Sequence, residues 1–247
     1  MKSKPTLALL HGWGMNPSVF DALAAQLKDD CTLLPLALPG HGGARILSDN
    51  SLATWAPHIA QQLPAQAILL GWSLGGQLAM SIALDSPERV SQLILVSTTP
   101  KFVLSPDWPA GMPEQDLQAF GVDLQHDTRG TLLRFLSLQT RGATAQKAIL
   151  QDLRASLSTQ ALPDTQALQV GLKMLLHTDL RTEVCQLSLP TLVIHGSLDK
   201  LAPPAAGAWL AKNIPSARHE LIDGAAHAPF LSHTAHVAEA ILEALHD

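Results

Sequence analysis

Cysteine is scarce in this chain, which contains only Cys31 and Cys185 among its 247 residues. Two cysteines cannot build the disulfide framework that stabilises many small secreted domains. Both have apolar neighbours, so we expect buried, reduced thiols. This cysteine usage favours a cytoplasmic protein.

Long apolar runs and an excess of basic charge are also missing. No stretch approaches the ~20 apolar residues that a membrane-spanning helix needs, and the first apolar run is too short for a secretory signal. The 16 Lys and Arg residues are outnumbered by 21 Asp and Glu residues, which gives a net charge of -5. This balance argues against an overall basic surface for nucleic acid or anionic lipid, although it leaves room for a local basic patch. We expect a cytoplasmic monomer without a nucleic-acid or membrane partner.

Short apolar runs alternate with helical patterns along most of the chain. Hydrophobic residues make up 47% of the sequence, an ordinary composition for a globular protein with one large core. The runs recur six times, and glycine-containing turns follow the first three, which is typical of parallel strands covered by helices. We therefore predict an α/β protein with at least six strands, at 6–10, 32–38, 66–71, 92–97, 191–195 and 219–222.

The pattern changes between residues 100 and 183. No strand-like run occurs there, and proline residues mark both ends of the segment. Helical spacing dominates 114–124, 131–138, 145–157 and 166–176. We predict that a helical lid, residues 100–183, is inserted into a core formed by residues 1–99 and 184–247.

The strongest local motif is Gly71-Trp72-Ser73-Leu74-Gly75, which follows an apolar run and precedes a helical pattern. In a nucleophile elbow, a serine occupies a strained turn between strand and helix, and small residues two positions away let neighbouring backbone approach. Ser73 is therefore the candidate nucleophile. A glycine-rich turn without chemistry remains the alternative for the motif alone.

A serine nucleophile needs a base and an acid that orients the base. Asp199 follows the run at 191–195, and His227 follows the run at 219–222, so both lie where strands end. We predict a triad of Ser73, His227 and Asp199. Asp223 is a rival acid only four residues before His227, but we favour a turn-capping role for it.

The turn His11-Gly12-Trp13-Gly14 follows the first predicted strand and could face Ser73. We assign the oxyanion hole to the backbone N–H groups of Trp13 and Leu74. The alternative is a tight turn that needs its glycines and nothing more. His11, His41, His195 and His233 lack the paired short spacing and the cysteines of a metal site, so we predict no metal.

The motifs HGWG, PGHG, GWSLGG and GAAHAPF occur in the order found in α/β-hydrolases, which the chain resembles over nearly its full length. Residues 71–76, 87–90, 134–140 and 225–230 together resemble the pimeloyl-acyl-carrier-protein methyl ester esterases of biotin synthesis. The resemblance implies an α/β-hydrolase fold with a mostly parallel central sheet, flanking helices and a helical lid. It also implies a serine carboxylesterase that releases methanol and free pimeloyl-acyl carrier protein without a cofactor.

The resemblance further implies which residues surround the substrate and which meet the acidic carrier. Residues 129–154 contain five basic residues and one acid, for a charge of +4, although solvated helix faces would give the same count. Two departures from the family are the leading hairpin, which we expect to be absent, and Gln151 at a basic position. A broad short-chain carboxylesterase and a non-catalytic ligand-binding protein remain alternatives. The substrate residues that the resemblance implies are Trp13, Ser73, Leu74, Phe135, Leu136, Ser137, Leu138, Gln139 and His227. For carrier binding it implies Arg134 and Lys147, and the basic segment adds Arg129 and Arg154 as candidates.

Overall fold

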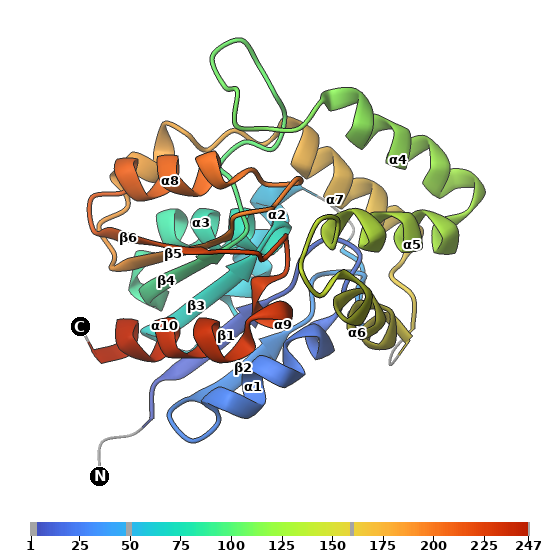
Figure 1. The fold of residues 1–247 in the computed structure, drawn as a ribbon. Coiled ribbons are helices and arrows are strands. Elements are labelled where there is room, and N and C mark those ends of the chain that lie inside the picture. The colour runs from blue at the N-terminus through green and yellow to red at the C-terminus, as the bar shows by residue number, and fades with distance from the viewer. Residues whose placement is uncertain (1–3, 48–50, 159–160, 247) are drawn as a thin grey trace.

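A six-stranded parallel sheet forms the centre of the protein, in a computed structural model that describes residues 4–47, 51–158 and 161–246 (Figure 1). The strand order is β2-β1-β3-β4-β5-β6, and each neighbouring pair is parallel. The predicted α/β fold is confirmed. The strands are β1 (Thr6–Leu10), β2 (Thr32–Leu36), β3 (Ala67–Trp72), β4 (Val90–Val96), β5 (Thr191–Gly196) and β6 (Ala217–Ile222).

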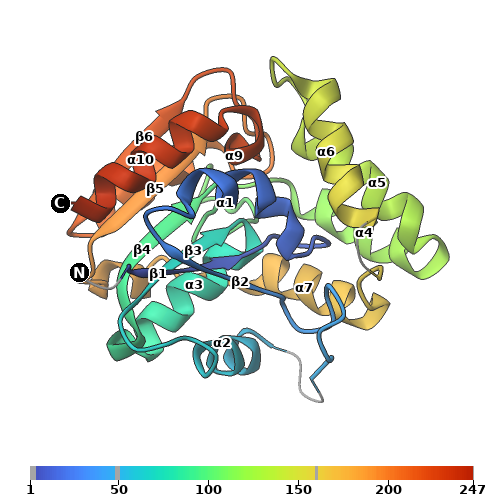
Figure 2. The same ribbon diagram turned by 90° about the horizontal axis from the view of Figure 1, so that it is seen from below.

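Helices cover both faces of this sheet, which is why every residue of β3 and of β5 is buried. α1 (Asp21–Leu27) and α10 (Thr234–His246) lie on one face, as the view from below shows (Figure 2). The opposite face carries α2 (Leu52–Ala60), α3 (Leu74–Asp85) and α8 (Pro204–Asn213). The short elements are η1 (Pro17–Phe20), η2 (Pro87–Arg89), η3 (Glu183–Gln186) and α9 (Pro229–Ser232).

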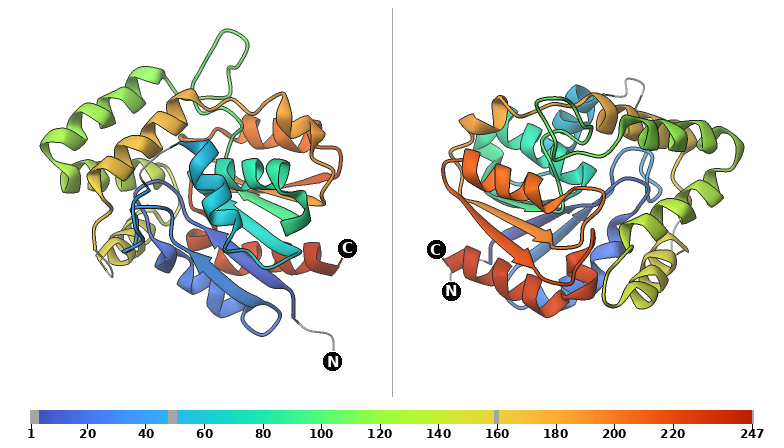
Figure 3. Two further views of the ribbon diagram at one scale, coloured as in Figure 1. Left: turned by 180° about the vertical axis from the view of Figure 1, so that it is seen from behind. Right: turned by 45° about the horizontal axis from the view of Figure 1, so that its top comes forward.

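Four helices follow β4 and lie together at the carboxyl ends of the strands (Figure 3). Local signals explain two of their starts: the Asp127 side chain accepts a hydrogen bond from the N–H of Gly130, and Asp164 accepts from Gln166 and Ala167. The helices are α4 (Glu114–His126), α5 (Thr128–Gln139), α6 (Gln146–Ser158) and α7 (Thr165–His177).

The two cysteines differ in exposure. Cys31 is buried as expected, but Cys185 is exposed, so that expectation was wrong. Cys185 lies in the short helix η3, where the neighbouring Val184 is buried instead. Among the described residues, no helix is long and apolar enough to cross a membrane.

Candidate active site

The strand-to-helix turn at Ser73 has a strained backbone. Ser73 lies between β3 and α3 with φ 57° and ψ −118°, a backbone conformation that residues other than glycine rarely adopt. Close backbone approaches explain the flanking glycines. A Cβ atom on Gly71 would lie 2.3 Å from the carbonyl oxygen of Gly75, and one on Gly75 would lie 2.4 Å from that of Leu10. The geometry is that of a nucleophile elbow.

Ser73, His227 and Asp199 form a continuous chain of hydrogen bonds. His227 Nε2 lies 3.0 Å from Ser73 Oγ, and His227 Nδ1 lies 2.8 Å from Asp199 Oδ2. The other carboxylate oxygen of Asp199 accepts from the N–H groups of Leu201 and Ala202 at 2.9 and 3.0 Å. The Asp199 carboxylate can only accept a hydrogen bond, so the imidazole proton lies on Nδ1. Nε2 is then left without a proton and can accept the one from Ser73.

Asp223, the rival acid, is exposed and makes no hydrogen bond to the triad within the described residues. Its Oδ1 accepts from the Ser197 hydroxyl at 3.0 Å, and Ser197 Oγ accepts from the N–H of Gly224 at 2.9 Å. These bonds join the turn after β5 to the turn after β6. Asp223 therefore has a turn-stabilising position.

The turn after β1 lies against the nucleophile. A Cβ atom on Gly12 would be only 3.2 Å from the Cβ of Ser73, so this turn can reach the position of an oxyanion. Leu74 is the first residue of α3, where a backbone N–H has no partner within the helix. The N–H of Trp13 likewise makes no hydrogen bond in the part of the chain that the structure describes. Trp13 and Leu74 stay our candidates for the oxyanion hole.

The Trp13 side chain binds the helical segment rather than solvent. It is fully buried, and its Nε1–H donates to the carbonyl of Leu168 on α7 at 2.8 Å. Its ring meets the Phe135 ring of α5 edge to face, with centroids 4.7 Å apart. The indole thus ties the turn after β1 to α5 and α7.

Main-chain hydrogen bonds connect the end of α5 to the loop that carries His227. The N–H of His227 donates to the carbonyl of Gln139 at 3.1 Å, and the N–H of Thr144 donates to the carbonyl of Gly224 at 3.3 Å. Sequence patterns gave no signal for these bonds, because backbone groups leave no mark on residue type.

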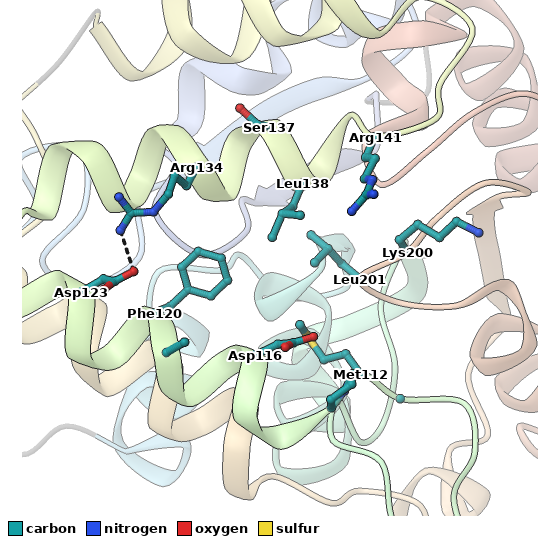
Figure 4. Close-up of a pocket in the computed structure, with 13 residues that line it drawn as sticks. Met112, Asp116, Phe120, Asp123, Arg134, Ser137, Leu138, Arg141, Lys200 and Leu201 are labelled. Atoms are coloured by element: carbon teal, nitrogen blue, oxygen red, sulfur yellow. Dashed lines mark hydrogen bonds and ion pairs between the residues drawn. The ribbon is translucent and has the colours of Figure 1, made fainter.

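A cavity of about 840 Å³ lies between α4 and α5 (Figure 4). Ser137 and Leu138 line it, whereas Phe135, Leu136 and Gln139 of the same predicted run are buried and do not. Ser73 does not line it either. The cavity reaches the triad loop at Leu201, whose N–H binds Asp199. Sequence reasoning missed the α4 side of the cavity, including Met112, Asp116 and Phe120.

The four basic candidates lie on different surfaces. Arg134 borders the cavity and pairs with Asp123 of α4 at 2.7 Å, as the dashed line in Figure 4 marks. Arg129 and Arg154 line one groove of about 500 Å³, together with Leu133, Leu157, Ser158 and Leu162. Lys147 is exposed on α6 and does not line that groove.

Three other histidines are buried in neutral form. Burial lowers the pKa of His11 to about 3, with a further contribution from His41, and lowers the pKa of His41 and of His195 to about 4. His11 Nε2 accepts from the N–H of Leu38, which fixes the turn beside it. No group of three or more metal-ligating side chains exists among the described residues.

Comparisons with known proteins agree with this geometry. Residues 5–234 match the family described as alpha/beta hydrolase fold. A pimeloyl-[acyl-carrier protein] methyl ester esterase from Nitrosomonas europaea is 43% identical, over 92% of this chain and 90% of the relative. The enzyme of the same name from Aeromonas salmonicida is 41% identical, over 96% of this chain and 94% of the relative.

Solved structures show the same fold. An esterase from Exiguobacterium antarcticum has a TM-score of 0.89 at 23% identity, covering 100% of this chain and 94% of its own. A bromoperoxidase from Bacillus anthracis has a TM-score of 0.85 at 20% identity, covering 99% of this chain and 93% of its own. At these identities the likeness concerns the fold alone.

The parallel sheet and the elbow at its third strand define the class, a serine hydrolase with the α/β-hydrolase fold. The sequence identities of 43% and 41% then identify the family within this class. The chain belongs to the pimeloyl-[acyl-carrier protein] methyl ester esterase family.

Proposed function

We propose that this protein hydrolyses the methyl ester of pimeloyl-acyl carrier protein in biotin synthesis. The observation that carries the proposal is the chain of hydrogen bonds from Ser73 through His227 to Asp199, at 3.0 and 2.8 Å. This arrangement supplies an activated oxygen nucleophile, and esters of carboxylic acids are its substrates in the family that the chain belongs to. No cofactor takes part in the proposed chemistry.

In the first half of the reaction, Ser73 Oγ attacks the ester carbonyl carbon while His227 Nε2 takes the hydroxyl proton. The backbone N–H groups of Trp13 and Leu74 bind the negative oxygen of the tetrahedral intermediate. The bond to the methoxy group then breaks, and His227 returns the proton to it, which releases methanol. Asp199 stabilises the transient imidazolium.

Water completes the cycle. It attacks the acyl-enzyme carbonyl as His227 takes a proton from it, and Ser73 leaves with that proton. The products are the free enzyme and the free carboxylate, still joined to its carrier. The cycle is balanced without any redox partner.

The cavity between α4 and α5 suits an acyl chain. Phe120, Leu138 and Leu201 supply apolar walls, and Leu201 lies next to the acid of the triad. Residues 100–183 act in this proposal as a lid over the active site, with Ser137 and Leu138 touching the chain. Phe135 packs edge to face on Phe120, one of these wall residues, with ring centroids 5.4 Å apart.

The groove between α5 and α6 suits an acidic carrier protein. Arg129 and Arg154 flank apolar side chains there, and Leu162 at its edge is 41% exposed. A carrier helix with acidic and apolar residues could pair its acids with the arginines and its apolar side chains with the leucines of this groove. Arg134 is a weaker candidate for carrier binding, because Asp123 already neutralises it.

The decisive assay measures kcat/KM for the carrier-bound methyl ester and for free dimethyl pimelate, with Ser73→Ala as the blank. We expect a strong preference for the carrier-bound ester and loss of both activities in the blank. Equal rates on the two esters would favour a broad short-chain carboxylesterase instead. Ester hydrolysis that persists in Ser73→Ala would refute the site.

A charge-reversal experiment tests the groove. Arg129→Glu with Arg154→Glu should raise KM for the carrier-bound ester at least ~10-fold at low salt and leave dimethyl pimelate unaffected. Lys28→Glu with Lys212→Glu is the matched control, because it changes the net charge by the same amount and both lysines are exposed outside the groove. If both changes raise KM equally, net charge explains the effect and the groove does not.

A further inference from the structure

Trp72 links the strand of the nucleophile to the loop of the base. It is the last residue of β3 and directly precedes Ser73. Its indole is fully buried, and Nε1–H donates to the main-chain carbonyl of His227 at 2.8 Å. Among the described residues, no other donor reaches this carbonyl. One rigid strand end thus carries Ser73 and holds the backbone of His227.

The indole has little freedom to move. Its ring packs edge to face on Phe230 with centroids 5.0 Å apart, and it lies 5.7 Å from the His227 ring. A Cβ atom on Gly12 would lie 3.2 Å from Trp72 Cε3. Trp72 therefore lies against Gly12 in the turn after β1, against His227 and against Phe230.

We propose that Trp72 is a positioning residue that keeps His227 Nε2 within hydrogen-bond distance of Ser73 Oγ. The proposal rests on the assignment of Ser73 and His227 as nucleophile and base. Without the indole N–H, a buried carbonyl loses its partner and the histidine loop loses its anchor to β3. A small displacement of the base lowers kcat strongly, because proton transfer requires close contact between the base and the nucleophile.

The chain offers a matched control for this bond. Trp108 is also buried, and its Nε1–H donates to a main-chain carbonyl, that of Lys101, at the same 2.8 Å. It packs in a separate cluster with Ala110, Ala206 and Trp209. Trp72→Phe and Trp108→Phe therefore delete equivalent hydrogen bonds, one beside the triad and one away from it.

The test compares both variants with p-nitrophenyl acetate, a substrate that needs neither the carrier groove nor a long acyl chain. Trp72→Phe should lower kcat about 10-fold with KM within about twofold, whereas Trp108→Phe should keep kcat within about twofold. Inactivation by diisopropyl fluorophosphate, in which Ser73 displaces fluoride as His227 takes the proton, should slow in parallel. Thermal unfolding measures the shared cost in stability.

Equal kcat values for the two variants would overturn the proposal, since the bond would then serve packing alone. Should Trp72→Phe not fold, Phe230→Leu is the second variant, because it removes the ring that supports the indole. A fall in kcat without a change in KM supports positioning, and an unchanged kcat overturns it. Failure of the carrier proposal would leave these results intact, because the substrate here has no carrier.

Discussion

Replacing Asp199 by Asn should place the imidazole proton of His227 on the wrong nitrogen. Oδ1 of Asp199 accepts from the N–H groups of Leu201 and Ala202, and Oδ2 accepts from His227 Nδ1. An amide has one oxygen, and we expect it to face the two backbone donors, since an NH₂ group there would meet two N–H groups. The NH₂ then faces Nδ1, which must accept, so the proton moves to Nε2 opposite Ser73.

An imidazole protonated at Nε2 cannot take the Ser73 proton. Asp199→Asn should therefore lower kcat by about 10³- to 10⁴-fold; the same change in a serine protease lowers kcat about 10⁴-fold. At ~1.4 kcal/mol per factor of ten, the loss of transition-state stabilisation is about 4 to 5.5 kcal/mol. Stability should change little, because the amide keeps both backbone hydrogen bonds and the shape of the side chain.

The assay is kcat on a small p-nitrophenyl ester, combined with thermal unfolding of the same preparations. Asp223→Asn is the matched control, because Asp223 is the exposed acid four residues before His227 and binds only Ser197 in the described residues. It should retain near-wild-type kcat. A kcat within tenfold of wild type for Asp199→Asn, or an equal loss in the control, would refute the assignment of the acid.

Three more changes test other parts of the structure. Between pH 6.5 and about 4, His11, His41 and His195 gain protons only in the unfolded chain, because burial lowers their pKa in the folded protein. The free energy of unfolding should therefore be highest above pH 6.5 and should be lower at pH 5.5, by about 4 kcal/mol for the three together. Urea titrations at pH 7.5 and 5.5 check this. Gly75→Ala puts a Cβ atom 2.4 Å from the Leu10 carbonyl oxygen and should lower the free energy of unfolding by ~3 kcal/mol or more. Gly121→Ala is the control, because its Cβ atom would lie 3.9 Å from its nearest neighbour and should cause no such loss. Thermal unfolding of the two variants measures the difference. Leu138→Ala should lower kcat/KM for a hexanoate ester about 10-fold and spare an acetate ester; equal losses would remove Leu138 from the acyl-chain wall.

Local patterns predicted the elements well because each element depends on nearby residues. The run at 6–10 is the strand Thr6–Leu10, and the helical spacing at 166–176 lies within Thr165–His177. The turn residues at Ser73 were also recognisable, since close backbone approach demands glycine on both sides. Strand order left no such local signal, because it depends on contacts between distant segments.

Contacts that join distant segments were beyond sequence reasoning. Arg134 carries the charge expected for a carrier site, yet its pairing with Asp123 depends on how α4 packs against α5. In the sequence Trp72 stands out only as part of the motif around Ser73, whereas in the structure its indole binds the carbonyl of His227, 155 residues later in the chain. Residue type alone could not distinguish an apolar wall from a hydrogen-bonded anchor.

The main-chain bonds between residues 139–144 and the loop that carries His227 limit how this scaffold can be engineered. Gln139 contributes a carbonyl and Thr144 an N–H, so these two bonds depend on the path of the chain through this segment. A chimera that exchanges α4 for that of another esterase can alter the cavity and leave these bonds in place. A chimera joined within 139–144 removes an anchor of the loop that carries His227, and a loss of turnover in it would say nothing about substrate preference.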